Sequence, residues 1–384
     1  MFWKKKRIYF DTAAGLAGNP SSAHTEGRQA KGLLEEARTT IARLVEVQPD
    51  DVIFTSGATE SNALAIRGVI GALRKAGEQD IHVLYLPSSH ASIVENVTAL
   101  KEEGVTIEAL PITDYRVDTE ALAGLLRPTT AMVTMDAVCG ETGVVWNTRE
   151  VADVVRTASA SGKFSPSRKG RHILLHVDAS QSPHTEKITR DHFGADILTF
   201  DASKVEVMRG LGVLIAHRTI PLLPLYQGGG QERGLRSGTE APEQAQLFAR
   251  ALKKATLNRD VFRASALRNR TRLIKDITRS IQQVFIQEGR VQVPSILNLS
   301  LPGRDTDYLV ALLDEAGFAV STRSACETDS ETGSRAVYAL TGDSEKAQAT
   351  IRISWGPAAR PGDFTRFARA FIRAVAFIDS SGRR

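Results

Sequence analysis

The sequence has few cysteines and no long apolar run. Cys139 and Cys326 are the only cysteines in 384 residues, which excludes a disulfide framework and indicates a reducing compartment. No segment reaches the roughly 18 to 20 consecutive apolar residues that a membrane-spanning helix requires. The basic residues 4–7 are not followed by the apolar stretch of a secretory signal. We therefore expect a cytoplasmic protein without a membrane partner.

The sequence also lacks a strong excess of charge of one sign. Its net charge of +5 is modest for this length, and 42% hydrophobic with 24% charged residues is typical of soluble globular proteins. Basic residues cluster only at 4–7 and 163–171, without the interleaved aromatic residues that would favour a nucleic-acid surface. We expect no direct binding of nucleic acid. We interpret the polar, basic segment 161–171 as a surface insertion.

Short apolar runs alternate with helix-forming stretches over the first part of the chain. The apolar runs predict strands at 7–11, 51–54, 81–86, 105–110, 131–135, 173–175 and 197–200. The stretches between them predict helices at 23–45, 56–73, 91–102, 118–128 and 148–159. This alternation is typical of an α/β fold with a doubly wound, mostly parallel sheet. Residues 211–216 are expected to return across the sheet as an antiparallel strand.

After Pro242 the pattern changes to long helical stretches with fewer strands. We expect helices at 242–255, 260–288 and 305–316, strands at 293–301 and 351–354, and a last helix from Asp363. These elements indicate a smaller α+β C-terminal domain. The predicted organisation is an N-terminal segment at 1–20, a large α/β domain at 21–240 and the small domain at 241–384.

Polar side chains follow two of the predicted buried strands. Asp178 ends the run that begins at 173, and Lys204 comes just after the run at 197–200. Ligands of open α/β sheets bind at the carboxyl ends of strands. A lysine there can hold a carbonyl cofactor as a Schiff base, and an aspartate can pair with a ring nitrogen. For either residue alone, a solvated strand end is the plainer interpretation.

Two more features are expected at the same edge of the sheet. Residues 55–60 lead from a strand into a helix, and such a turn can bind a phosphate through its N–H groups and hydroxyls. An ordinary helix cap would use the same residues. His90 opens the next helix, where it could stack on a flat cofactor and exchange protons, or could be a helix-start histidine without a ligand. Because all these features share one edge, we favour a functional site.

Two loops add candidate residues. Residues 228–239 contain five glycines, so the backbone could approach a ligand closely, although a flexible surface loop is the alternative. Cys326 lies in a polar loop that begins at Ser321, where its thiolate could act as a nucleophile. Arg352, on the strand after this loop, could bind a carboxylate with two hydrogen bonds.

Taken together, these motifs resemble the cysteine desulfurases of the class V aminotransferase group. The resemblance covers nearly the whole chain and rests on residues 11–14, 18–22, 55–60, 176–181, 204, 209–212, 228–239, 324–326 and 351–354. The stretches 228–239 and 324–326 point to desulfurases rather than to ordinary aminotransferases. The resemblance implies an enzyme of fold type I, with a seven-stranded sheet that binds pyridoxal 5′-phosphate (PLP).

The resemblance implies which residues would hold the cofactor. Lys204 would form the Schiff base, Asp178 would pair with the ring nitrogen, and Gln181 would bond the phenolic oxygen. His90 would stack on the ring. The phosphate would be held by Ala58, Thr59 and Ser203, and by Thr239 from the neighbouring subunit of a homodimer.

The resemblance also implies a reaction. Arg352 would bind the carboxylate of L-cysteine, Lys204 would move its Cα proton, and His90 would help to deprotonate its thiol. Cys326 would take the sulfur as a persulfide and L-alanine would leave. An acceptor protein of iron–sulfur cluster assembly or tRNA thiolation would then receive the sulfur. The alternatives are another class V enzyme, such as a selenocysteine lyase or an aminotransferase, and a non-catalytic partner-binding protein.

Two positions depart from the family pattern. The asparagine expected beside the cofactor ring is replaced by Gly140, which follows Cys139, so Gln181 would have to make the contact to the ring oxygen alone. Asp201 stands near the phosphate site, where the family more often has a serine. Its carboxylate would repel a phosphate unless it turned away or were bridged by a cation, so we do not assign it as a ligand.

Overall fold

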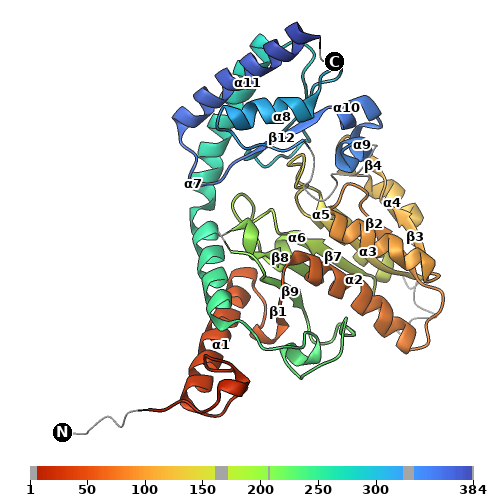
Figure 1. Ribbon diagram of the computed structural model, residues 1–384. Helices are drawn as coiled ribbons and strands as arrows, with labels where there is room; N and C mark the ends of the chain where they lie inside the picture. The colour runs from red at the N-terminus through yellow and green to blue at the C-terminus, as the bar shows by residue number, and fades with distance from the viewer. Residues whose placement is uncertain (1–6, 161–171, 206–207, 323–332, 383–384) are drawn as a thin grey trace.

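The computed structural model describes residues 7–160, 172–205, 208–322 and 333–382. Its centre is a seven-stranded sheet in the order β1-β9-β8-β7-β6-β2-β3 (Figure 1). These strands are β1 (Val52–Thr55), β2 (His82–Tyr85), β3 (Thr106–Ala109), β6 (Thr130–Asp136), β7 (Leu174–Asp178), β8 (Ile197–Asp201) and β9 (Gly212–Ala216). Strands β3, β2, β6, β7 and β8 are parallel, whereas β9 pairs antiparallel with β8 and β1. The predicted mostly parallel sheet with a returning antiparallel strand is confirmed.

Helices cover both faces of this sheet (Figure 1). They are α1 (Thr25–Val45), α2 (Ala58–Lys75), α3 (Ala91–Glu102), α4 (Thr119–Leu125), α5 (Thr148–Ala160) and α6 (Arg190–Phe193). Alternate strand residues point to opposite faces, so each strand serves two cores. In β9, for example, Val213 and Ile215 pack with residues of α1 and α5, whereas Leu214 packs with residues of α2 and α3. The short apolar runs of the sequence therefore form strands that are buried on both sides.

A second, smaller sheet lies beyond the long helix α7 (Pro242–Ser280). It consists of β10 (Phe285–Ile286), β11 (Ile296–Ser300) and β12 (Thr350–Ser354), which are antiparallel. The helices of this part are α8 (Thr306–Glu315), α9 (Arg335–Thr341), α10 (Ser344–Gln348) and α11 (Pro361–Ser381). A separate hairpin of β4 (Ile112–Thr113) and β5 (Arg116–Val117) lies between β3 and α4 in the chain. The buried apolar side chains of α11 pack with those of β11 and β12 and form a separate core.

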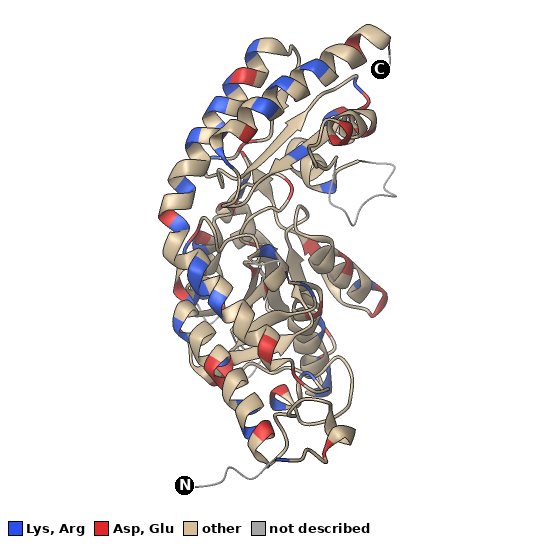
Figure 2. Ribbon diagram, turned by 60° about the vertical axis from the view of Figure 1, so that its left-hand side comes forward, with Lys and Arg blue, Asp and Glu red and all other residues tan. Residues whose placement is uncertain are grey.

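Helix α7 connects the two parts. It packs against α1 at one end and against α11 at the other (Figure 1). Its charged side chains are more often basic than acidic (Figure 2). The division of the chain into domains near residue 240 stays a prediction. None of the helices in the described ranges is both long and apolar enough to cross a bilayer.

Two sequence predictions about local structure are wrong. Residues 7–11 form no strand, because their side chains bond to the loop and to α1 instead: the Tyr9 hydroxyl donates to the carbonyl of Gly15, and Asp11 accepts from Ser22. The helices expected at 242–255 and 260–288 are one helix that ends at Ser280. The helix continues through the polar residues between them, where the Asn258 side chain donates to the carbonyl of Lys254 one turn earlier.

His176 in the middle of the sheet gives the fold a specific pH dependence. Its ring lies between hydroxyls of the two neighbouring strands, 2.8 Å from Thr134 Oγ1 and 3.1 Å from Thr199 Oγ1. Burial lowers the pKa of His176 from 6.5 to about 4. Between these two values the unfolded chain binds a proton that the folded chain does not, so stability falls as the pH falls through this window.

We expect His176→Gln to weaken this pH dependence. Glutamine can still bond both threonines but does not titrate. Between pH 6.5 and about 5, the wild type should lose about 1–2 kcal/mol more unfolding free energy than the variant, as measured by urea unfolding. Identical pH slopes for the two proteins would contradict the assignment.

Candidate active site

Most of the predicted site residues line one cavity of about 280 Å³ at the carboxyl edge of the large sheet. They come from the N-terminus of α2, the start of α3, the ends of β7 and β8, and β12. The predicted residues in its wall are Ala58, Thr59, His90, Asp178, Gln181, Lys204 and Arg352. Residues more than two hundred positions apart in the sequence therefore meet in one place.

Asp178, the last residue of β7, is held firmly at the floor of the cavity. Its Oδ2 accepts a hydrogen bond of 2.7 Å from Asn62 Nδ2, and its Oδ1 accepts one of 2.9 Å from the Ser180 amide. Two donors fix the orientation of the carboxylate, which is buried. Sequence reasoning missed Asn62. The signal that could have found it is its helical spacing from the apolar residues Ala65, Ile66 and Val69, which puts a polar side chain on the apolar face of α2.

His90 caps the N-terminus of α3 and is tied to the same asparagine. Its Nδ1 accepts from the Ser92 amide at 3.2 Å and lies 2.8 Å from Ser92 Oγ. Ser92 Oγ in turn accepts from Asn62 Nδ2 at 2.8 Å. Because Nδ1 accepts a hydrogen bond, a neutral His90 ring carries its proton on Nε2. Asn62 therefore positions both Asp178 and His90.

The N-terminus of α2 binds an anion, and that anion is a side chain of this protein. The Ala58 amide donates to Asp201 Oδ2 at 2.9 Å. The amide and the hydroxyl of Ser203 both donate to Asp201 Oδ1, at 2.8 and 2.6 Å. Three donors therefore converge on one carboxylate, beside Lys204. We call these three donors, which are the Ala58 amide and the amide and hydroxyl of Ser203, the anion cradle; that the turn at residues 55–60 binds a phosphate stays a prediction.

The position of Gly140 explains how the site accommodates the missing asparagine. A Cβ atom at Gly140 would lie 3.2 Å from Gln181 Nε2, so the Gln181 side chain lies close against this backbone. The carbonyl of Gly140 accepts a hydrogen bond of 3.1 Å from Arg352 Nη1. Arg352 on β12 thus reaches across from the smaller sheet. Arg335 on α9 also lines the cavity and donates to the carbonyl of Ser89 at 2.9 Å, a second cation that sequence reasoning missed.

Two further side chains in the cavity wall are buried and have raised pKa values. Burial, followed by the nearby Asp136 and Glu141 carboxyls, raises the pKa of the Cys139 thiol to about 12. Cys139 is therefore a protonated, unreactive thiol at neutral pH. Burial also raises the pKa of Asp136 well above its usual value, although the Ser89 hydroxyl donates to it at 2.9 Å.

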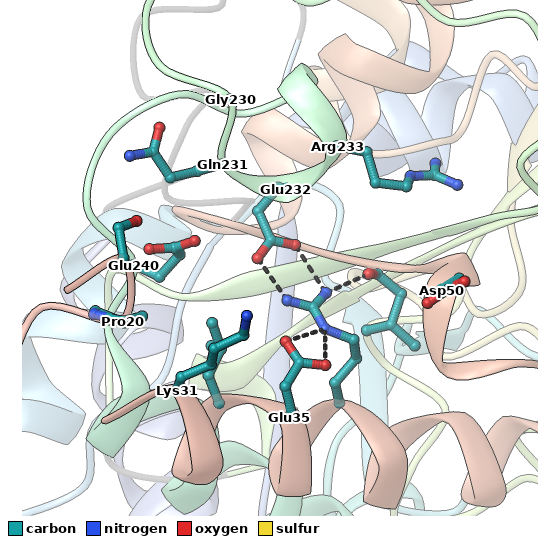
Figure 3. A pocket seen from close by; sticks show the side chains of 13 residues that line it. Pro20, Lys31, Glu35, Asp50, Gly230, Gln231, Glu232, Arg233 and Glu240 are labelled. Atoms are coloured by element: carbon teal, nitrogen blue, oxygen red, sulfur yellow. Dashed lines mark hydrogen bonds and ion pairs between the residues drawn. The ribbon is translucent and has the colours of Figure 1, made fainter. Parts of the chain in front are cut away.

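The loop at residues 228–239 is anchored rather than free. Its Glu232 accepts two hydrogen bonds from Arg38 of α1, at 2.7 and 2.9 Å (Figure 3). It accepts a third from the Phe54 amide at 2.8 Å. The guanidinium of Arg38 also lies over the Phe54 ring, 5.0 Å from its centroid. Beside this pair lies a polar hollow of about 420 Å³ (Figure 3). The arginine that holds this loop comes from α1, 194 residues away in the sequence.

Two predicted residues lie apart from the cavity wall, and a third is not among the described residues. Ser203 reaches it only through its bonds to Asp201, and Thr239 is not among the lining residues. Cys326 lies outside the described residues. Both flanks of its segment are attached to the wall of the cavity: Ser321 pairs with the backbone of Arg352, and Ser334 Oγ donates to Glu141 Oε2 at 2.5 Å.

A lysine, a fixed carboxylate and an anion cradle at the carboxyl edge of a doubly wound sheet define an enzyme that binds a carbonyl cofactor bearing an anionic group. The chain belongs to the aminotransferase class-V family, which matches residues 7–367. Enzymes of this family depend on PLP.

Among the members of this family, the chain is similar to cysteine desulfurases. The mitosomal cysteine desulfurase of Encephalitozoon cuniculi is 32% identical over 364 residues, which are 93% of this chain and 80% of that protein. Cysteine desulfurase IscS of Vibrio campbellii is 32% identical over 359 residues, which are 92% of this chain and 84% of that protein. The solved structure of a NifS-like protein has a TM-score of 0.83 at 27% identity and covers 94% of this chain and 92% of its own. The resemblance to cysteine desulfurases is confirmed.

The residues of the cavity suit PLP. The fixed carboxylate of Asp178 is the partner that a pyridine nitrogen needs, and Lys204 supplies the amine. The cradle at Ala58 already holds a carboxylate, which stands in for the oxygens of an anionic group. The site therefore offers partners for the ring and, where the Asp201 side chain leaves them, donors for the phosphate.

We expect Asn62→Leu to loosen the cofactor ring. The change removes the amide that fixes Asp178 and leaves Ser92 without its donor. PLP should bind at least about tenfold more weakly, and its absorption spectrum should shift, because ring protonation then depends on a loosely held carboxylate. Asn62→Asp, which keeps the size but not the donors, is the matched comparison. Binding and spectrum identical to the wild type would refute the role of Asn62.

We expect Glu232→Ala to destabilise the protein strongly. The change removes the buried carboxylate that pairs with Arg38, which keeps only the half-exposed Glu35 and the Val52 carbonyl as acceptors, and it removes the acceptor of the Phe54 amide. Loss of one member of a buried pair costs about 3–5 kcal/mol. The free energy of unfolding should fall by this amount, whereas Glu46→Ala, at an exposed helix end, should change it by less than about 1 kcal/mol.

Proposed function

We propose that this protein is a PLP-dependent cysteine desulfurase that takes sulfur from L-cysteine, leaves L-alanine and carries the sulfur as a persulfide on Cys326. The observation that carries the proposal is the attachment of both flanks of the Cys326 segment to the cavity that contains Lys204. Cys139 stays protonated, so Cys326 is the remaining thiol that could accept sulfur. Support also comes from a solved relative that is described as SspA in complex with cysteine, 26% identical with a TM-score of 0.73.

Each side chain of the cavity has a role in this proposal. When bound, PLP supplies an electron-withdrawing ring that stabilises negative charge on the substrate. Lys204 holds the cofactor and moves the Cα proton, Asp178 pairs with the ring nitrogen, and Gln181 bonds the ring oxygen. Ala58 and Thr59 supply amides to the phosphate, with Ser203.

Arg352 and His90 serve the substrate. The Arg352 guanidinium has five N–H groups, of which one donates to Gly140, and it can bind the substrate carboxylate with others. His90 stacks on the ring. Its Nδ1 accepts from the Ser92 amide, so the neutral ring presents an Nε2–H that can donate to the substrate thiolate and favour loss of the thiol proton.

The sulfur-transfer step balances without an external oxidant. The Cys326 thiolate forms a bond to the substrate sulfur while the bond between that sulfur and Cβ breaks. The electron pair of the broken bond stays on the carbon, which takes up a proton to give L-alanine. The sulfur remains on Cys326 as a persulfide, which an acceptor protein of iron–sulfur cluster assembly or tRNA thiolation then receives.

The protein is proposed to act in the cytoplasm as a homodimer. Thr239 lies outside the cavity of its own chain and would reach the phosphate of the neighbouring subunit. Several large apolar side chains on α7 are exposed, including Leu257 and Val261, each at 74%. Such a surface supports contact with a second subunit.

A non-catalytic, partner-binding protein is the second candidate, because Gly140 and Asp201 depart from the family pattern. Another class V enzyme, a selenocysteine lyase or an aminotransferase, remains an alternative. An aminotransferase has no need of Cys326, so the sulfur chemistry separates these possibilities.

The test is a comparison of Cys326→Ser with Cys139→Ser in the full-length protein. Wild type and Cys139→Ser should form alanine and a protein persulfide from L-cysteine. Cys326→Ser should lose at least about 99% of both, and should keep the absorption of bound PLP, because Cys326 is not needed to bind the cofactor. Persulfide formation by Cys326→Ser would contradict the proposal.

Lys204→Ala provides the spectroscopic control. The visible absorption of lysine-bound PLP should disappear in this variant and remain in Cys326→Ser. A wild-type protein that binds PLP without this absorption, or an unchanged spectrum in Lys204→Ala, would show that the cofactor is held elsewhere.

A further inference from the structure

The anion cradle of this protein contains a carboxylate of its own. Asp201 Oδ2 accepts a hydrogen bond of 2.9 Å from the Ala58 amide, and Oδ1 accepts hydrogen bonds from the amide and the hydroxyl of Ser203. These donors are among those that would bind the phosphate of PLP. We propose that Asp201 is a specificity-determining residue that competes with the cofactor's phosphate group for the cradle, so that this chain gains less affinity from the phosphate than from the ring. The inference rests on the proposed function, which makes PLP the ligand.

The geometry leaves no room for both anions at the Ala58 amide. Asp201 Oδ2 lies 3.3 Å from where a Cβ atom of Gly57 would stand, so it is seated directly against the turn. An amide N–H that already donates at 2.9 Å cannot donate equally well to a phosphate oxygen. A phosphate can occupy this position only if the Asp201 side chain leaves it.

The charges near the cradle reinforce the competition. Glu60, in the first turn of α2, accepts from the Ser56 amide at 2.6 Å, so a second carboxylate stands close by. Arg236, a cation near the cradle, lies 3.4 Å from Glu60 and already forms an ion pair with it. A phosphate that enters the cradle therefore faces two negative side chains, and the repulsion at short range lowers its affinity.

The residues that would hold the cofactor ring make their hydrogen bonds without Asp201. Asp178 is held by Asn62 and Ser180, and His90 is held by Ser92. None of these bonds involves Asp201. Pyridoxal, which lacks the phosphate, should therefore bind with the same affinity whether or not Asp201 is present, and the ratio of pyridoxal to PLP dissociation constants isolates the effect on the phosphate.

The experiment compares Asp201→Ser, Asp201→Asn and wild type, each stripped of cofactor and titrated with PLP and with pyridoxal. Serine and asparagine can both cap the short helix that follows residue 201, so the fold should be retained. Absorption of the lysine-bound aldehyde reports binding, without reference to turnover. Asp153→Ser, at an exposed position of α5, is the control for the substitution itself.

Asp201→Ser should bind PLP at least about tenfold more tightly than wild type, while pyridoxal affinity changes by less than about threefold. Asp201→Asn removes the charge but keeps an oxygen that can accept from the Ala58 amide. Its PLP affinity should therefore lie between those of wild type and Asp201→Ser. Asp153→Ser should match wild type. Equal PLP affinity in wild type and Asp201→Ser, or an equal gain for both ligands, would overturn the inference.

Failure of the inference can be told apart from failure of the proposed function. If wild type and all variants bind PLP through Lys204 with equal affinity, Asp201 has no role in specificity but the cofactor assignment stands. If no variant shows the absorption of a lysine-bound aldehyde with either ligand, both are overturned.

Discussion

The close approach of two glycines brings the parts of the active site together. Gly212 in β9 pairs with Thr55 of β1 on one side and with Asp201 of β8 on the other. A Cβ atom on Gly212 would lie only 2.6 Å from the carbonyl carbon of Gly57. Any other residue at 212 would push the turn between β1 and α2 away from the sheet. The anion cradle and the strand that ends near Lys204 lie together because this position is glycine.

Buried polar groups then hold the site in shape. Asn62 connects Asp178 with Ser92 and, through it, with His90, so that the residues at the ring end form one network. At β1, the strand that precedes α2, the Arg38–Glu232 pair holds the glycine-rich loop against the sheet. Buried polar groups are costly without partners, so these contacts leave the cavity few alternative shapes.

The smaller sheet completes the cavity. Arg352 and Arg335 supply positive charge opposite Lys204, and the flanks of the segment that contains Cys326 are attached to the same wall. In the proposed desulfurase, the large sheet holds the cofactor, and the smaller part binds the substrate and supplies the accepting thiol. The carboxylate of Asp201 in the cradle distinguishes this chain from the pattern of its family and bears on cofactor affinity rather than on the chemistry of sulfur transfer.

The sequence by itself determined the alternation of strands and helices and the residues that follow each strand, because both depend on local patterns. Asp178, Lys204 and His90 were found in this way. Only the tertiary structure decided the partners of these residues. The bonds from Asn62 to Asp178, from Ala58 to Asp201 and from Arg38 to Glu232 join positions 116, 143 and 194 residues apart. Such contacts depend on strand order and on which helix face meets the sheet, and no local pattern contains that information.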